Sequence, residues 1–138
     1  MKKGKKKKVD SINTFLGFDT DIEGKIEFRG TIRIDGKVKG KICSNGGTVI
    51  VAEKAVVDSE IVVDKAIIMG EIKGSIKANN RIEIYPPGRV IGDIQTNVIL
   101  IEAGAVFKGK CSMKNRGFSS EKPIDSTKKL NNLKANKN

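Results

Sequence analysis

Apolar and charged residues alternate strictly in the stretch TIRIDGKVKGKI, residues 31–42. Every even position from Ile32 to Ile42 is apolar or glycine, and every odd position between them is charged. This period of two is typical of a β-strand with one buried face. Gly36 and Gly40 interrupt the pattern, and glycine inside a strand often marks a bend or a close approach of backbone. The stretch therefore predicts short strands separated by bends.

The same pattern recurs along the chain with a period near 17 residues. A five-residue unit (apolar, any, Gly or Ser, any, apolar) appears six times, and its central residues are separated by 16, 19, 15, 18 and 17 positions. Those central residues are Gly24, Gly40, Ser59, Gly74, Gly92 and Gly109. A second ladder of apolar pairs begins at Ile32, Val49, Ala66, Ile82 and Ile99, in steps of 17, 17, 16 and 17. Two ladders with one period indicate a repeat architecture.

A period this short predicts an all-β fold, a single-stranded parallel β-helix (β-solenoid) of about six coils of about 17 residues. The domain is expected to span residues 15–113. Equivalent residues would stack about 4.8 Å apart, with Ile, Val and Leu in inward columns. Glycine suits the corners because it accepts positive φ and adds no side chain against the next coil; the expected corners are Gly24, Gly40, Gly74, Gly92 and Gly109. A hairpin meander, for which Asp35-Gly36 is a turn pair, and a β-sandwich remain as alternatives.

Both ends of such a solenoid are apolar in this sequence. Solenoids that stay monomeric usually carry polar caps over their end coils. Here INTFLGF precedes the first unit, and Val98–Ile101 and Val106-Phe107 lie in the last coil. Repeated end contacts give an open filament rather than a closed oligomer. The predicted polymerisation interface contains Phe107, Val106, Ile99, Ile101, Phe15, Leu16 and Phe18.

Two alternatives concern the apolar positions at the end and on the side of this rod. Phe107 could plug a neighbouring molecule, or it could fill a wider end of its own core. Ile50, Ile67 and Leu100 follow inward positions, so they are expected to face outward, with Glu83 interrupting them. Such a stripe could support lateral bundling.

The net charge of +11 belongs to the two ends of the sequence. Residues 1–11 hold six Lys and one Asp, residues 112–138 seven basic and two acidic residues, and residues 12–111 fourteen basic and thirteen acidic residues. Segments 1–14 and 114–138 are predicted to be disordered basic tails. In the second, Phe118, Ile124, Leu130 and Leu133 could form a docking motif, with a plain spacer as the alternative. The first contains Lys2, Lys3, Lys5, Lys6, Lys7 and Lys8, which are predicted to contact anionic lipid.

Two other interpretations of this lysine run stay open. Basic arms also bind nucleic acid non-specifically, but the nearly neutral body, without an aromatic platform, gives nucleic acid little support. The run could also be a solvated bristle that keeps filaments apart.

Candidate chemistry for an enzyme is sparse. The chain has no His, two Cys without metal-ligand spacing, and acidic residues scattered singly among lysines. Solenoid acyltransferases of the hexapeptide class generally need a His as general base. We expect no cofactor, no metal and no catalytic residue. Cys111 lies in an inward slot, and both cysteines are expected to be reduced, in the cytoplasm. No secretory signal or membrane span is expected, since the longest aliphatic run is VILI.

The motif IRIDGKVKGKI, the ladder behind it and the tail–rod–tail layout resemble the bactofilins, a family of polymer-forming bacterial cytoskeletal proteins. The resemblance covers about residues 15–112 and implies a right-handed β-helix and self-assembly without nucleotide. It also implies a scaffold at the cytoplasmic face of the inner membrane. Such scaffolds serve cell shape, local cell-wall synthesis or the positioning of recruited proteins. In the family an aromatic near the last coil belongs to the polymer contact, and Phe107 is the matching position. The first coil, NTFLGFDTDIEGKI, is more aromatic than is common in the family.

Overall fold

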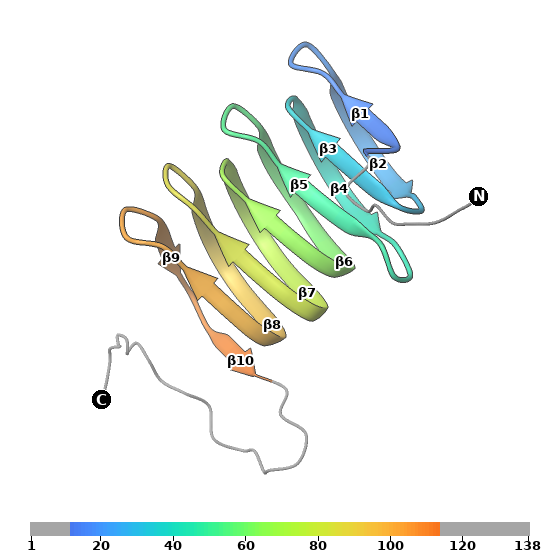
Figure 1. Ribbon diagram of the computed structural model, residues 1–138. Coiled ribbons are helices and arrows are strands. Elements are labelled where there is room, and N and C mark those ends of the chain that lie inside the picture. Colours follow the sequence, from blue (N-terminus) through green and yellow to red (C-terminus); the bar gives the residue numbers. More distant parts are fainter. Residues whose placement is uncertain (1–11, 114–138) are drawn as a thin grey trace, which may run out of the picture.

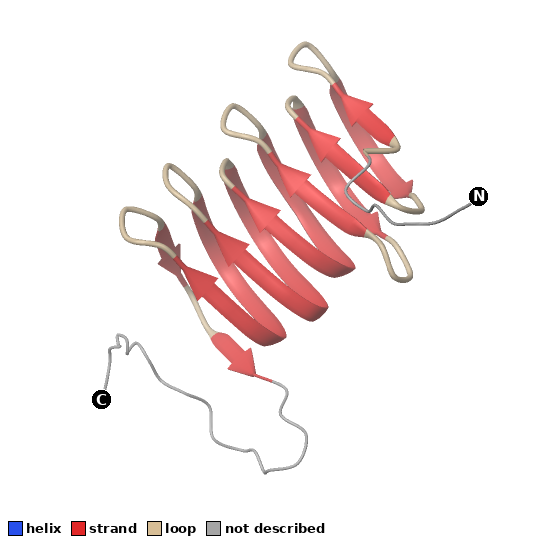
Figure 2. Cartoon of the chain, viewed as in Figure 1, coloured by secondary structure: helices blue, strands red, loops and turns tan. Residues whose placement is uncertain are grey.

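The computed structural model describes residues 12–113, and every regular element in that range is a β-strand (Figures 1 and 2). None of these residues forms a helix, so none of them provides a helix able to cross a membrane. The strands are β1 (Thr14–Leu16), β2 (Asp21–Glu27), β3 (Thr31–Ile34), β4 (Lys37–Cys43), β5 (Thr48–Val51), β6 (Val56–Ile68), β7 (Glu71–Ile84), β8 (Arg89–Ile101), β9 (Val106–Lys108) and β10 (Cys111–Met113).

The strands wind into a parallel β-solenoid of about six coils, which confirms the predicted fold class (Figure 1). Every strand pair in the sheet is parallel, and each segment pairs with the segment one coil further along the chain. Tight hairpins would instead produce antiparallel pairs. The hairpin meander and the antiparallel sandwich are therefore excluded.

The two sequence ladders become two sets of stacked inward columns. Ile32 pairs in register with Val49, Val49 with Ala66, Ala66 with Ile82 and Ile82 with Ile99. The five-residue unit, whose central residue is Gly or Ser, contributes two further inward columns. They run Ile22, Val38, Val57, Ile72, Val90, Phe107 and Ile26, Ile42, Ile61, Ile76, Ile94, Cys111. In the middle coils these side chains have lost nearly all contact with solvent. Their burial is the main force that holds one coil on the next.

Strands continue through the glycine positions instead of stopping there. The prediction placed bends between short strands, but β6, β7 and β8 contain 13, 14 and 13 residues and each covers more than one side of the rod. Gly92 lies inside β8 with a φ of 142°, and Gly40 lies inside β4 with a φ of 130°. Hydrogen bonding to the neighbouring coil thus persists across the corner while the backbone changes direction.

The glycine column is also where backbones approach most closely. A Cβ atom on Gly92 would lie 1.7 Å from the carbonyl oxygen of Gly74, and one on Gly40 would lie 2.0 Å from that of Gly24. Ser59 occupies the same column between Gly40 and Gly74, and its hydroxyl donates a hydrogen bond to the Val38 carbonyl.

The solenoid begins slightly earlier than the sequence predicts. The Asn13 backbone N–H donates to the Thr31 carbonyl at 2.8 Å, and the Asn13 side-chain oxygen accepts from the Thr31 N–H at 2.8 Å. These two bonds attach Asn13 to the next coil, and β1 begins at Thr14. Residues 1–11 and 114–138 of the predicted tails, including the run from Lys2 to Lys8, lie outside the described residues.

Candidate functional site: the two ends of the solenoid

The last coil presents the inward columns with nothing stacked on them among residues 12–113. Ile99, Phe107 and Cys111 continue columns whose members in the preceding coil are at most 2% exposed. In the last coil these three residues are only partly buried, although all three pack against the core. Ile101 is 43% exposed. The C-terminal end is therefore an open apolar cross-section of the core.

The first coil presents a matching apolar cross-section. Leu16 lies in register with Ile34, Ile22 with Val38, and Ile26 with Ile42. Leu16, Ile26 and Phe28 pack against the core from one side and remain partly exposed on the other. The predicted interface included only Leu16 of this group. Ile22, Ile26 and Phe28 could have been identified, since the first two begin the buried columns and a first member has a neighbour on one side only.

Three residues predicted at the interface have side chains on the outside of the rod. Phe15 is in register with Arg33 on the outer surface, is 60% exposed, and lies 5.9 Å from the Arg33 guanidinium. Phe18 lies in the turn before β2, is 65% exposed, and has the Lys54 ammonium 5.8 Å from its ring centroid.

Val106 follows Arg89 in an outward column, beside the inward column of Phe107. A shift of one residue moves a strand side chain to the other face, so hydrophobicity alone did not place these three residues.

Both ends of the rod also have strand edges with unpaired backbone groups. Strands β1 and β2 pair only with the second coil, and β9 and β10 pair only with β8. Each therefore has one edge without a β-partner among residues 12–113. Unpaired edges of this kind are templates for strands of another chain. The ends thus offer both apolar side chains and backbone pairing, the two interactions that stack coils within the rod.

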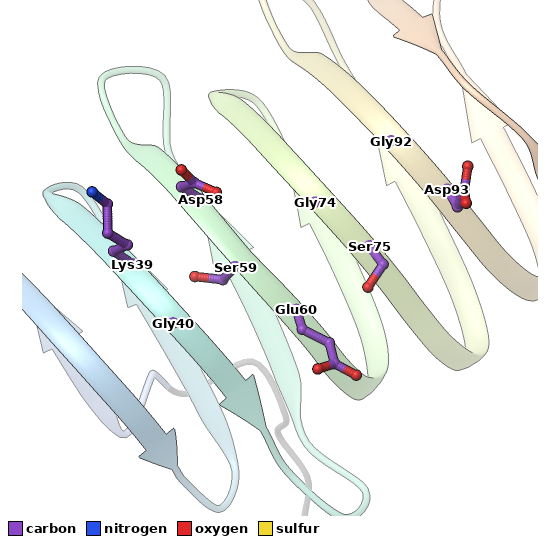
Figure 3. Close-up of a pocket in the computed structure, with 9 residues that line it drawn as sticks. All are labelled: Lys39, Gly40, Asp58, Ser59, Glu60, Gly74, Ser75, Gly92 and Asp93. Atoms are coloured by element: carbon purple, nitrogen blue, oxygen red, sulfur yellow. The ribbon is translucent and has the colours of Figure 1, made fainter.

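A shallow groove follows the glycine column on the outside of the rod (Figure 3). Lys39, Asp58, Glu60 and Asp93 line it, and it exists because the corner glycines carry no side chain. Asp58 and Glu60 come from β6 and Asp93 comes from β8, and all three carboxylates point outward in the view. The chain has no His to serve as a base beside them. No group of metal-ligating side chains is found among residues 12–113.

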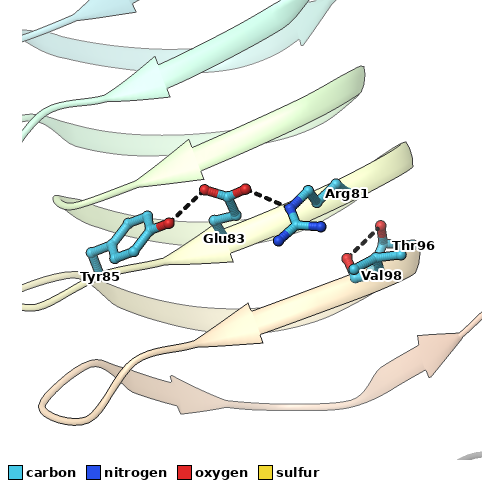
Figure 4. Close-up of polar contacts among 5 residues, drawn as sticks. All are labelled: Arg81, Glu83, Tyr85, Thr96 and Val98. Carbon is cyan, nitrogen blue, oxygen red and sulfur yellow. Dashed lines mark hydrogen bonds and ion pairs between the residues drawn. The ribbon is translucent and has the colours of Figure 1, made fainter.

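The charged side chain of Glu83, near the end of β7, is held in position by hydrogen bonds to side chains two residues away on either side (Figure 4). Glu83 accepts hydrogen bonds from Arg81 Nε and from the Tyr85 hydroxyl, the latter at 2.6 Å. Burial alone would raise the pKa of Glu83, but these hydrogen bonds and the charges of Arg81 and Lys65 lower it below its ordinary value. Glu83 is thus an ionised, positioned carboxylate at neutral pH. The same contact with Glu83 raises the pKa of Tyr85.

Comparison with known proteins identifies the family of this solenoid. Residues 14–112 match the family described as "Bactofilin: Polymer-forming cytoskeletal". The chain is 38% identical over 101 residues to bactofilin BacO of Myxococcus xanthus (strain DK1622), covering 73% of this chain and 79% of BacO. It is 32% identical over 101 residues to bactofilin BacP of the same organism, covering 73% of this chain and 42% of BacP.

A solved structure agrees with the sequence comparison. The match is to a chain in a cryo-EM reconstruction of Thermus thermophilus bactofilin double helical filaments, with a TM-score of 0.65 and 28% sequence identity. It covers 72% of this chain and 99% of that chain. The predicted resemblance is thereby confirmed, and the chain belongs to the bactofilins, a family of polymer-forming cytoskeletal proteins.

Proposed function

We propose that this chain is the subunit of a cytoskeletal filament that assembles end to end without nucleotide. One observation carries the proposal: columns that are fully buried in the middle coils end in partly exposed apolar residues at both ends of the rod. Joining two ends would bury these residues and pair the free strand edges, which is favourable for the same reasons that coil stacking is. The match to bactofilins, one of them in a filament, supports this assignment.

Such a contact requires no energy source beyond burial and backbone pairing. Because each subunit has two ends, a contact formed at one end leaves the other available, and the assembly grows as an open filament. Equal ends or unlike ends can meet, since either arrangement covers the apolar columns.

Negative-stain electron microscopy of the purified full chain, without nucleotide and across a range of salt, tests the proposal. We expect long unbranched filaments a few nanometres wide that persist in high salt, because apolar contacts are not screened by ions. A monodisperse small particle at every concentration would contradict the proposal. A trimeric particle would point instead to the solenoid enzymes.

We also propose that the filament lies at the cytoplasmic face of the inner membrane, held by the lysines between Lys2 and Lys8. Each lysine near an anionic surface contributes about 1 kcal/mol of attraction. A polymer multiplies this weak attraction, since every subunit adds its own contact. There the filament would act as a scaffold for cell shape, for local cell-wall synthesis or for positioning other proteins.

Replacing the six lysines by glutamine is expected to abolish cosedimentation of the filaments with vesicles containing anionic lipid. Replacing the same six lysines by arginine keeps the charge and should keep the binding, which makes it the matched control. Vesicles of neutral lipid should bind neither variant. If the glutamine variant cosediments as well as the unmodified chain, the lysine run is not the membrane contact.

A further inference from the structure

Most of the solenoid surface consists of strands whose backbone pairs with the neighbouring coils. The outer face, formed by the outward side chains of β1, β3, β5 and the second halves of β6, β7 and β8, is an example. One of its columns contains Ile50, Ile67 and Leu100, with Glu83 between the last two, so the predicted outward stripe is confirmed. The loop of residues 44–47, which joins β4 to β5 and projects from the rod, is built differently (Figure 1).

This loop contains an Asn-Gly pair, Asn45-Gly46, and the sequence has no other. Asparagine loses its side-chain amide most readily when glycine follows it. The backbone nitrogen of the next residue attacks the side-chain carbon, and glycine has no side chain to obstruct that approach. Every other asparagine of residues 12–113 is followed by a residue with a side chain. The sequence therefore distinguishes Asn45 from the other asparagines of the solenoid.

The structure of the loop leaves both reacting groups accessible. Asn45 and Gly46 are exposed, and Gly46 has a φ of 87°. Even an added Cβ on Gly46 would have nothing within 4 Å. No hydrogen bond among residues 12–113 involves the Gly46 N–H or the Asn45 side chain. Neither group has to give up a protein hydrogen bond before it reacts.

Two other asparagines show the opposite situation. The Asn97 side chain, in β8, donates a hydrogen bond to the Asn79 carbonyl at 2.9 Å. The side-chain oxygen of Asn13 accepts from the Thr31 N–H at 2.8 Å. A side-chain amide held in this way must first break its hydrogen bond, which costs free energy. Asn13 and Asn97 are therefore expected to react more slowly than Asn45.

We infer that Asn45 is a modification site, at which the chain converts its own asparagine into aspartate and isoaspartate. The Gly46 backbone nitrogen loses its proton to a base in the solvent and attacks Cγ of Asn45. A bond forms between this nitrogen and Cγ, the bond from Cγ to the side-chain nitrogen breaks, and ammonia leaves. Water then opens the resulting cyclic imide at either carbonyl carbon. One opening gives aspartate and the other isoaspartate, with no oxidation or reduction at any step.

Hydrogen bonds on both sides of the pair keep the change local. The Ser44 N–H donates to the Val62 carbonyl at 2.9 Å, and the Gly47 carbonyl accepts from the Asp64 N–H at 3.0 Å. Isoaspartate lengthens the main chain only between these two anchors, so the stacked columns are expected to persist. Each modified subunit gains a carboxylate on the side of the rod, which lowers its net charge by one.

The site is also separate from the ends of the rod. The flanking strands β4 and β5 each pair with a strand on both of their edges. The reaction therefore needs only a folded subunit, and the inference does not rest on end-to-end assembly.

Mass spectrometry of the purified full chain, incubated in mildly alkaline buffer and then digested with trypsin, tests the site. Cleavage after Lys41 and Lys54 releases residues 42–54, which contain Asn45 as their single asparagine and no glutamine. We expect this peptide to gain the mass difference between an amide and an acid, and to separate into two products on chromatography. Peptides with the other described asparagines should stay unchanged over the same time. The gain should be slower in weakly acidic buffer, because the attacking nitrogen must lose its proton.

Asn45→Gln is the matched variant, since it keeps the amide but makes ring closure with the Gly46 nitrogen much less favourable. Its peptide should lose the gain in mass. A synthetic peptide of residues 42–54 is the second control and should react without the fold. Circular dichroism of the modified chain should equal that of the fresh chain.

Two results would each overturn the inference. One is a full chain that stays unmodified at Asn45 while the synthetic peptide reacts, since the folded loop would then keep the two groups apart. The other is an equal gain in mass in the Asn45→Gln variant. Neither result depends on filaments, so the proposed function is tested separately.

Discussion

Replacing Phe107 with arginine is expected to abolish filaments while leaving the subunit folded. Phe107 continues the column of Val90 at the C-terminal end and packs against the core, but only from one side. In the isolated subunit an arginine here can extend into water. In a filament its charge would be buried at the junction without a partner, which costs several kcal/mol. A loss of about 3 kcal/mol corresponds to a rise in critical concentration of roughly 100-fold or more.

Val106→Arg is the matched control for this prediction. Val106 is the adjacent residue, but its side chain follows Arg89 in an outward column, so an arginine is already accepted there one coil earlier. Sedimentation and electron microscopy should show filaments of Val106→Arg and only subunits of Phe107→Arg, with equal circular dichroism. Filaments of both variants would show that Phe107 lies outside the contact and fills only its own core.

Gly92→Ala is expected to destabilise the solenoid strongly, although it adds only one methyl group. The new Cβ would lie 1.7 Å from the Gly74 carbonyl oxygen, and the backbone φ of 142° is a conformation that alanine rarely adopts. A backbone carbonyl cannot move aside without breaking the stacking of two coils. The combined strain and crowding are expected to cost about 3–5 kcal/mol of unfolding free energy.

Gly24→Ala separates the two contributions. Gly24 heads the same column with a similar φ of 137°, but nothing lies within 4 Å of its added Cβ. The free energy of unfolding of Gly24→Ala should therefore fall only by the cost of the unfavourable backbone conformation, about 1–3 kcal/mol. Urea unfolding of both variants in the Phe107→Arg background gives the two free energies without the complication of polymerisation. Equal losses would mean that φ alone requires glycine in this column and that coil spacing relaxes to admit a methyl group.

The architecture was predictable because the repeat is so regular. In a solenoid, stacked coils must place equivalent residues above one another, so a period near 17 also predicts which residues pair. Ile32 with Val49 and Gly74 with Gly92 are two such pairs, and the structure has both. The continuity of β6, β7 and β8 through the corners could not be predicted in the same way. Glycine in a sequence indicates a bend but does not show whether hydrogen bonding stops there.

The candidate surfaces were predictable in part. The sequence located the open ends, because apolar residues fill the first and last coils where a cap would be polar. It did not indicate that the side chains of Phe15, Phe18 and Val106 lie on the outside of the rod, because an aromatic or aliphatic side chain near an end is compatible with either face. The hydrogen bonds to Glu83 were not predicted from the sequence. Arg81 and Tyr85 lie two residues away on either side of Glu83, and the structure shows that both side chains are oriented toward its carboxylate.

The sequence by itself determined the period, the inward columns, the glycine corners and the family of this protein, because each depends on spacing along one chain. Only the tertiary structure decided which end residues remain half-exposed and which side chains share the outer face. Those properties arise when residues 15 to 19 positions apart come to lie side by side, as Arg33 and Ile50 do. Exposure and the order of charges along a face are properties of that stacked surface, and both are decided by neighbours from other coils.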